Sequence, residues 1–289
     1  MKTFFDCIPC VVRQTLDSVR LLTDDEAIHE RVLRDVLRAA AEMDLRQTPP
    51  EMAQRIHRSI RGQLGRRDPY REIKDRFNQM AMELYARLRE EMNDSDDPLE
   101  TAVRLAIAGN IIDLGVKADL SEAEVYNSVR QSLSDRLDGN FEAFAEAVSK
   151  ANEILYLADN AGEIVFDRLL IEQIGPAKVT VAVRGAPVIN DVTMADARDT
   201  GLTGLVEVID NGSDAPGTIL DDCSEDFRRR FDEADLVIAK GQGNYETLSE
   251  ATREIYFLLK AKCPVIARDI GCQTGSMVLQ RSTVSTAIA

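Results

Sequence analysis

The stretch that decides the fold runs Ile154-Leu155-Tyr156-Leu157-Ala158-Asp159-Asn160-Ala161-Gly162-Glu163. Its first half is apolar, its second half is largely polar, and the change occurs between two adjacent residues. A short apolar run that ends in such residues is typical of a strand buried on both faces. The polar residues then lie at the tip of that strand, where the next helix begins.

The same pattern recurs along the second half of the chain. The later runs are 179–183 before Arg184-Gly185-Ala186-Pro187, 206–209 before Asp210-Asn211-Gly212, 236–239 before Lys240-Gly241-Gln242-Gly243-Asn244, and 265–267 before Arg268-Asp269-Ile270-Gly271. Helix-length segments separate them, so we predict an α/β fold with a Rossmann-like, mostly parallel sheet of about five or more strands flanked by helices. Ligands of such sheets bind beyond the carboxyl ends of the strands, so these loops should assemble one site.

The first half of the chain has a different pattern. Apolar positions recur at helical spacing in 10–22, 27–43, 73–88 and 99–112, and strand signals are scarce before residue 152. We therefore predict a helical region over 1–150 and an α/β region that binds metal and phosphate over 151–289. No Gly- or Ser-rich linker lies between them, which predicts that the helical region packs on the sheet as one compact body.

The composition limits the partners. The chain has 289 residues, with 50 acidic and 35 basic side chains and a formal net charge of −15. This charge repels nucleic acid and anionic membranes and favours cations, so we expect a small substrate assisted by a metal ion. No apolar run is long enough for a signal peptide or a membrane span, and five cysteines do not suggest a disulfide framework. We expect a cytoplasmic protein with reduced thiols.

Asp159 and Asn160 offer hard oxygen ligands of the kind that Mg²⁺ or Mn²⁺ prefers. The free amides of the following helix can hold phosphate oxygens. Taken alone, the pair is more often a helix N-cap, but the neighbouring loops favour the ligand interpretation. Asp191 falls in the first turn of a predicted helix, where an acid complements the helix dipole. Asp196 lies deeper in that helix without such a local role, and is the better candidate for a later ligand.

The loop Lys240-Gly241-Gln242-Gly243-Asn244 combines a lysine with glycines that let the backbone approach an anion. It is not a P-loop, and no strand-linked Gly-x-Gly-x-x-Gly occurs. We predict that Lys240 is a catalytic cation for the phosphoryl group. Lys260 and Lys262 are candidates for a second cation, although a solvated lysine is the commoner outcome.

The spacing of Cys7 and Cys10 is that of zinc and redox sites. A closed zinc site needs four ligands, but there is no second such pair, and the two histidines, His29 and His57, are expected on helix surfaces. A thioredoxin-like strand before the cysteines is also lacking. A structural role is therefore favoured for both cysteines, and a Ser-His-Asp hydrolase is disfavoured.

Several motifs together resemble one family. They are Cys7-Ile8-Pro9-Cys10, Asp68-Pro69-Tyr70 with Lys74 and Asn78, Ala108-Gly109-Asn110-Ile111-Ile112-Asp113-Leu114-Gly115, Asp159-Asn160-Ala161-Gly162-Glu163, Arg184-Gly185 with Pro187 and Asn190-Asp191-Val192-Thr193, and Lys240-Gly241-Gln242-Gly243-Asn244. The ordered set extends from Asp6 to Gly271 and is more specific than any single motif. It resembles the DUF89 family of metal-dependent damage-control phosphatases, in its compact archaeal and bacterial branch.

This resemblance implies a helical region packed on an α/β sheet, and hydrolysis of small phosphoesters such as sugar phosphates or phosphopantetheine derivatives. It implies one divalent metal ion (Mn, Mg, Co or Ni), held by Asp159, Asn160 and a later aspartate, for which Asp196 is our candidate. Together with the chemistry of the loops, it suggests substrate contacts at Glu163, Gly241, Gln242, Gly243, Asn244, Lys260 and Asn110. Asn110 and Asp113 belong to a family motif to which the resemblance assigns no definite role.

The chemistry leaves two further interpretations open. One is a methyltransferase that uses S-adenosylmethionine, although its expected Gly-x-Gly turn is missing after the first strand. The other is a non-catalytic protein that binds phosphorylated metabolites through a metal ion. Within the phosphatase interpretation, the nucleophile is either a water molecule on the metal ion or a carboxylate such as Asp159.

The cysteine pair gives a direct test. Because the sequence offers no completing ligands, the double variant Cys7→Ser, Cys10→Ser should keep most of its turnover and its metal content. Steady-state kinetics and metal analysis of the purified variant would check this. Loss of one equivalent of zinc together with activity would contradict it.

Overall fold

The computed structural model, which describes residues 1–111 and 122–282, is built on one seven-stranded sheet. The strands are β1 (Leu137–Gly139), β2 (Ile154–Leu157), β3 (Val179–Val183), β4 (Glu207–Asp210), β5 (Leu236–Lys240), β6 (Ile255–Lys260) and β7 (Met277–Arg281). Their spatial order is β1-β7-β6-β5-β2-β3-β4. Within this sheet, β6 and β7 pair antiparallel and the other neighbours pair parallel. The predicted α/β fold with a mostly parallel sheet is confirmed.

Four of the predicted strands form where expected, as β2, β3, β4 and β5. The fifth is wrong, because residues 265–267 lie in helix α12 (Pro264–Ile270), with Pro264 at the start of the helix. The strand that occupies this part of the sheet is β6, which lies just upstream. A three-residue apolar run does not distinguish a buried strand from a buried helix, and a proline in the first turn favours a helix. Strands β1 and β7 were not predicted.

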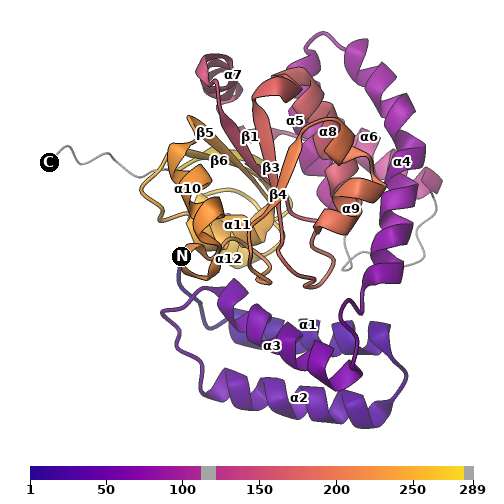
Figure 1. Ribbon diagram of the computed structural model, residues 1–289, viewed down its shortest axis with the longest axis vertical. Coiled ribbons are helices and arrows are strands. Elements are labelled where there is room, and N and C mark those ends of the chain that lie inside the picture. The colour runs from indigo at the N-terminus through magenta and orange to yellow at the C-terminus, as the bar shows by residue number, and fades with distance from the viewer. Residues whose placement is uncertain (112–121, 283–289) are drawn as a thin grey trace, which may run out of the picture.

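Helices cover both faces of the sheet (Figure 1). Tyr156 and Ile238 face a core shared with α4 (Arg71–Asn93), α5 (Pro98–Ala108), α6 (Glu122–Leu133), α7 (Phe141–Lys150), α8 (Glu163–Ile174) and α9 (Met194–Asp199). Leu155 and Val237 face the opposite core, with α10 (Glu225–Glu233), α11 (Gly241–Leu248) and α12. Neighbouring residues of one strand thus enter opposite cores, as the pleat requires.

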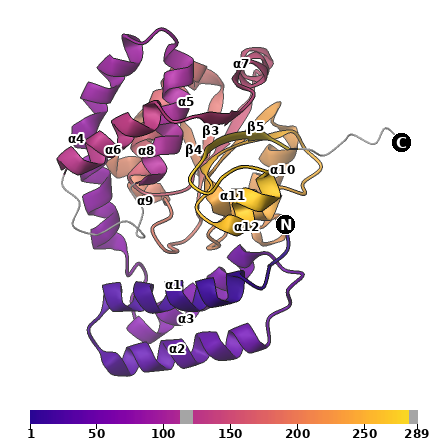
Figure 2. The same ribbon diagram turned by 180° about the vertical axis from the view of Figure 1, so that it is seen from behind.

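The first three helices form a separate layer at one end of the molecule (Figures 1 and 2). They are α1 (Cys7–Leu22), α2 (Glu26–Ala41) and α3 (Pro49–Leu64), and they enclose a small apolar core of their own. We call these three helices the N-terminal bundle. The bundle contacts the loops that follow the carboxyl ends of the strands, because Arg61 donates to the carbonyl oxygen of Pro187 at 2.6 Å and α3 packs against α11.

The helical region predicted for 1–150 also contributes a strand, because β1 pairs with β7 at the edge of the sheet. The division at residue 150 stays a prediction. Within residues 1–111 and 122–282, no helix is both long and apolar enough to cross a membrane.

A polar clamp holds the N-terminal bundle against the sheet. Asp214, in the loop after β4, accepts hydrogen bonds from Gln54 at 2.7 Å, from both Nε and Nη2 of Arg58, and from Arg61. The three donors lie on one helix, α3. Burial opposes ionisation of Asp214, but the hydrogen bonds from Arg58 and Arg61 outweigh it and lower the pKa of this carboxyl.

Removing the clamp should loosen the bundle. We expect Asp214→Ala to lower the free energy of unfolding by about 2–3 kcal/mol, because it leaves two guanidinium groups and one amide without their acceptor. Asp44→Ala is the control, since Asp44 pairs with Arg46 on the surface, where such a pair contributes at most about 1 kcal/mol. Urea denaturation of both variants measures the difference, and equal losses would contradict the clamp.

Candidate functional site

Asp159 lies at the point where the strand order of the sheet reverses. The chain passes from β2 to β3 and β4 on one side, and then returns to place β5 and β6 on the other side of β2. Loops after β2 and β5 therefore diverge, and parallel sheets bind ligands in the crevice that this leaves. Gly241, which begins α11, lies against Asp159: a Cβ atom at Gly241 would come within 1.9 Å of Asp159 Oδ2. Only glycine allows this close approach.

Two amide side chains connect Asp159 to a second buried carboxylate, Glu163. Asn160 donates its Nδ2 to Asp159 Oδ2 at 2.7 Å and to Glu163 Oε2 at 3.0 Å. Asn110 does the same, at 3.3 Å and 2.6 Å. Burial raises the pKa of Asp159 well above its usual value, and the negative charges of Glu163 and Asp191 raise it further. The pair of carboxylates therefore favours a positively charged partner.

Lys240 has a different position from the one predicted. Its side chain is fully buried, and its Nζ donates to Glu163 at 2.7 Å, to Asp167 at 2.6 Å and to the carbonyl oxygen of Ala106 at 2.8 Å. An ammonium group has three hydrogens to donate, and these acceptors use all three. Burial lowers the pKa of Lys240, but the two carboxylates raise it by more. The predicted direct contact between Lys240 and phosphate finds no support in this geometry.

Asp167 completes this buried cluster. Its Oδ1 accepts from Lys240 and from the hydroxyl of Tyr156 at 2.7 Å, while its Oδ2 is buried and has no hydrogen-bond partner in the described part of the chain. Burial raises the pKa of Asp167 to about 6, although Lys240 acts in the opposite direction. Lys240 thus neutralises one carboxylate of the cluster and leaves the others with excess negative charge.

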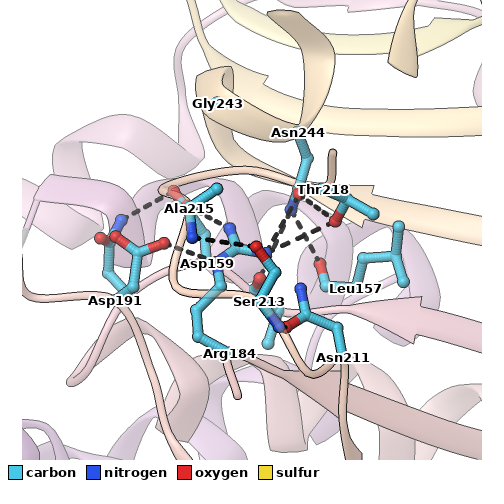
Figure 3. Close-up of polar contacts among 12 residues, drawn as sticks. Leu157, Asp159, Arg184, Asp191, Asn211, Ser213, Ala215, Thr218, Gly243 and Asn244 are labelled. Carbon is cyan, nitrogen blue, oxygen red and sulfur yellow. Dashed lines mark hydrogen bonds and ion pairs between the residues drawn. The ribbon is translucent and has the colours of Figure 1, made fainter. Parts of the chain in front are cut away.

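Asp191 approaches Asp159 from the loop after β3 (Figure 3). Asn160 and Asp191 form an antiparallel bridge, and the amide of Val192 donates to the carbonyl oxygen of Asp159 at 2.8 Å. Arg184 lies between the two carboxylates. Its Nε donates to Asp191 Oδ2 at 2.7 Å, and its Nη2 lies 3.7 Å from Asp159 Oδ1. Asp191, which the sequence analysis treated as a helix-dipole acid, therefore belongs to the site.

Asp196 lies in a separate, fully paired environment. Its Oδ2 accepts from the amide and hydroxyl of Thr193, at 2.8 Å and 2.6 Å, and from Lys74 Nζ at 2.7 Å, and its Oδ1 accepts from Asn78 at 3.1 Å. Burial raises its pKa, but Lys74 and Thr193 lower it by more. Both oxygens are thus committed to the protein, and Thr193 and Asp196 form a capping box at the start of α9.

The motif that includes Asp68, Lys74 and Asn78 now has a structural explanation. Lys74 also lies 3.3 Å from Asp68, and Asn78 accepts a hydrogen bond from the amide of Gly162 at 2.7 Å. Asn78 therefore links Asp196 to the turn that carries Asn160 and Glu163. The spacing of Lys74 and Asn78 on one face of a helix was the signal in the sequence, but it did not reveal their partners.

The other residues predicted to contact substrate lie in α11 and in the segment at the end of β6. Asn244 is fully buried and donates to the carbonyl oxygen of Lys240 at 2.7 Å, which makes it a structural residue of the loop. Gln242 accepts from the amide of Lys262 at 3.3 Å, so the start of α11 is connected to the segment after β6. Lys262 is exposed, and its positive charge acts on Asp159 to lower the pKa of that carboxyl. Lys260 is half-buried at the end of β6. Of the two lysines, Lys262 is the one whose charge acts on Asp159.

The histidine and cysteine side chains singled out from the sequence do not carry reactive groups of the site. His57 is buried beside Tyr70, not on a helix surface, and burial lowers its pKa to about 3. Burial raises the thiol pKa of Cys7 and of Cys10, which disfavours a reactive thiolate. Asp113 lies outside the described residues.

The donor set fits a hard divalent cation. Asp159 and Asp191 provide carboxylate oxygens, and the amide of Asn160 provides another oxygen, all of which suit Mg²⁺ or Mn²⁺. No group of three His, Cys, Asp or Glu side chains converges for metal binding within 1–111 and 122–282, so a cation at this site would need Asn160 or water as well. The excess negative charge of the buried cluster is the independent observation in favour of a cation.

Comparisons with known proteins identify relatives over nearly the whole chain. The sequence profile described as "Damage-control phosphatase ARMT1-like domain" matches residues 3–278. A damage-control phosphatase of Archaeoglobus fulgidus is 38% identical over 94% of this chain and 96% of its own length. A damage-control phosphatase of Pyrococcus horikoshii is 37% identical over 98% of this chain and 99% of its own. The crystal structure of a DUF89 family protein from Pyrococcus horikoshii, 36% identical, superposes with a TM-score of 0.88 and covers 98% of this chain and 100% of that one.

The position of Lys240 leads to a test of its role. Lys240→Met would leave Glu163 and Asp167 buried without their cation, so we expect the free energy of unfolding to fall by about 3–5 kcal/mol. Lys150→Met is the control, because Lys150 is 72% exposed and pairs with Glu146 in the same helix. Urea denaturation gives both values. If Lys240→Met kept the stability of the native protein and lost only activity, a direct role toward phosphate would be restored.

Proposed function

The chain belongs to the damage-control phosphatase ARMT1-like family, and on that premise we propose that it is a metal-dependent phosphatase that hydrolyses small phosphorylated metabolites. The family match favours this function over the methyltransferase and the non-catalytic binding protein. Sugar phosphates and phosphopantetheine-type compounds are the substrate classes to test first. The cytoplasmic location expected from the composition stays a prediction.

One observation of the structure carries the proposal. Four buried carboxylates (Asp159, Glu163, Asp167 and Asp191) surround two buried cations (Arg184 and Lys240) at the switch point of the sheet. Four negative and two positive groups give a formal excess of two negative charges. Burying unbalanced charge is costly, and one divalent cation would remove the excess.

We propose Asp159, Asn160 and Asp191 as the residues that hold this cation, with Asp191 in place of Asp196. Asp191 lies next to Asn160 through the antiparallel bridge, whereas the carboxylate of Asp196 is saturated by Lys74, Thr193 and Asn78. The candidate ions are Mn²⁺, Mg²⁺, Co²⁺ and Ni²⁺, since oxygen ligands select hard cations and leave the choice among them to geometry.

A bound divalent ion supplies Lewis-acid stabilisation of the phosphoryl oxygens and of the charge that develops on them. The protein prepares the rest of the site. Glu163 is fixed by Lys240 and Asn110, and the first-turn amides of α11 begin beside Asp159, where they can donate to phosphate oxygens. Lys262 is exposed near Asp159 and is the candidate to attract the anionic substrate, with Lys260 as the alternative.

The proposed function has a direct test. The purified chain is incubated with a panel of phosphorylated sugars, phosphopantetheine derivatives and nucleotides, each with Mn²⁺, Co²⁺, Ni²⁺ or Mg²⁺, and phosphate release is measured. We expect release that depends on the added metal and stops with a chelator. Binding of Mn²⁺ and of phosphoesters without turnover of any of them would instead indicate a binding protein.

The ligand set has a separate test, based on Mn²⁺ affinity measured by calorimetry without substrate. Asp159→Asn and Asp191→Asn should each raise the Kd for Mn²⁺ by more than about a hundredfold, because each removes a charged ligand and not merely an outer-shell contact.

Asp196→Asn is the matched control for this test. It should change the Kd for Mn²⁺ much less, and should instead lower the free energy of unfolding by about 3 kcal/mol, because Lys74 loses its buried partner. Loss of Mn²⁺ binding in Asp196→Asn, with normal binding in Asp191→Asn, would return the third ligand to Asp196.

A further inference from the structure

Arg184 follows β3 directly, and its guanidinium group reaches into the loops of the strands on either side (Figure 3). Its Nε donates to Asp191, in the loop after β3 itself. Its Nη1 lies 3.3 Å from Asn244 Oδ1, after β5, and 3.5 Å from Thr218 Oγ1, after β4. Its Nη2 lies 3.7 Å from Asp159, after β2. The strands β5, β2, β3 and β4 are neighbours in that order, so one planar group contacts residues that follow four adjacent strands, with Asn244 lying in α11.

The side chain of Arg184 is too enclosed to touch a substrate. Its exposed fraction is 1%, and Nη2 is buried without a hydrogen-bond partner in the described part of the chain. Nη2 lies 3.7 Å from the charged oxygen Oδ1 of Asp159. A buried donor that lacks its hydrogen bond is costly, so the protein holds this nitrogen next to Asp159 against a free-energy penalty.

The neighbours of the guanidinium are themselves fixed. Thr218 donates to Asn244 at 2.8 Å, and Asn244 in turn donates to the carbonyl oxygen of Lys240 at 2.7 Å. Gly185 and Ala186 donate to the carbonyl oxygen of Ser213, so the loops after β3 and β4 are also joined through their backbones. The Nη1 end of the guanidinium therefore has a rigid support, and the Nε and Nη2 side faces the two carboxylates.

From this geometry we infer that Arg184 is a positioning residue, whose planar fork sets the spacing of Asp159 and Asp191 for one divalent cation. The inference rests on the proposed metal-dependent function for the identity of the two ligands. Two adjacent carboxylates without a cation repel each other, and a guanidinium held between them opposes that repulsion at fixed positions. A lysine has the same charge, but all of its donors lie on one nitrogen, whereas the Nε, Nη1 and Nη2 atoms of Arg184 reach Asp191, Asn244 and Asp159 from three separate positions in one plane.

The variant Arg184→Lys separates shape from charge. It keeps the net charge of the site, so the electrostatic attraction for a cation is preserved while the fork is lost. We expect the Kd for Mn²⁺, measured on the full chain without substrate, to rise about tenfold or more, as for other residues that orient metal ligands. The kcat for a phosphoester should fall while KM changes little. Arg89→Lys is the control, since Arg89 pairs with Glu172 between α4 and α8, and it should leave the Kd for Mn²⁺ unchanged.

A second variant keeps the inference testable if Arg184→Lys does not fold. Thr218→Val preserves the volume of the side chain and removes the hydroxyl that supports Nη1 and Asn244. It should raise the Kd for Mn²⁺ by a smaller factor than Arg184→Lys. Thermal unfolding of each variant without metal checks that the change in Kd is not a general loss of structure.

The results distinguish this inference from the proposed function. A native Kd for Mn²⁺ in Arg184→Lys, or in Thr218→Val if Arg184→Lys does not fold, would overturn the positioning role, whatever the enzyme hydrolyses. If the native chain released no phosphate from any ester, but bound Mn²⁺ and lost affinity in Arg184→Lys, the proposed function would fail and the positioning role would stand.

Discussion

The burial of four carboxylates at the switch point of the sheet is the constraint on which the rest of the structure depends. A carboxylate loses most of its hydration when it is buried, and it is tolerated only with hydrogen bonds and opposite charge. The protein supplies both. Lys240 donates to Glu163 and Asp167, Arg184 to Asp191, and the amides of Asn110 and Asn160 bridge Asp159 to Glu163. These partners come from four separate segments of the chain, so the site exists only when those segments have packed.

The compensation is incomplete, and this gives the site its chemistry. Lys240 and Arg184 neutralise two of the four negative charges. Burial raises the pKa values of Asp159 and Asp167, and the charge of Glu163 raises both further, although Arg184 and Lys240 act in the opposite direction. A cluster that was fully neutral would gain nothing from a cation. In the proposed function, this excess charge favours a divalent ion, and the exposed Lys262, whose charge acts on Asp159, is the proposed point of approach for an anionic substrate.

The helical half of the chain takes part in the site and does more than cover the sheet. Asn110 bridges the carboxylates from the end of α5, while Asn78 on α4 connects Asp196 with the turn that begins α8. The N-terminal bundle has its own core but is held by the polar clamp on Asp214. In the same loop, the carbonyl oxygen of Ser213 accepts from the amides of Gly185 and Ala186, which follow Arg184. Stability of the bundle and order in the site are therefore linked through one loop.

The sequence by itself determined the strands β2, β3, β4 and β5 and the pair Asp159-Asn160 at the tip of β2. Short Val- and Ile-rich runs bounded by polar loops have few other solutions, because such runs must be buried on both faces. The ordered motifs also indicated the family. The sequence predicted the fifth strand at 265–267, which is helical, and not at β6. Short buried helices and short buried strands have the same apolar composition, so this run did not tell them apart.

Only the tertiary structure decided which polar groups meet. Lys240 follows a strand next to glycines, which favours a phosphate contact, yet its partners are Ala106, Glu163 and Asp167, which lie 73 to 134 residues away in sequence. Asp191 and Asp196 are both aspartates of the same segment. Asp191 lies beside Asn160, whereas Asp196 pairs with Lys74. Local pattern fixes the type of group at each position. Its charge partner is fixed by the packing of distant segments, and this partner determines whether the group is free to bind a ligand.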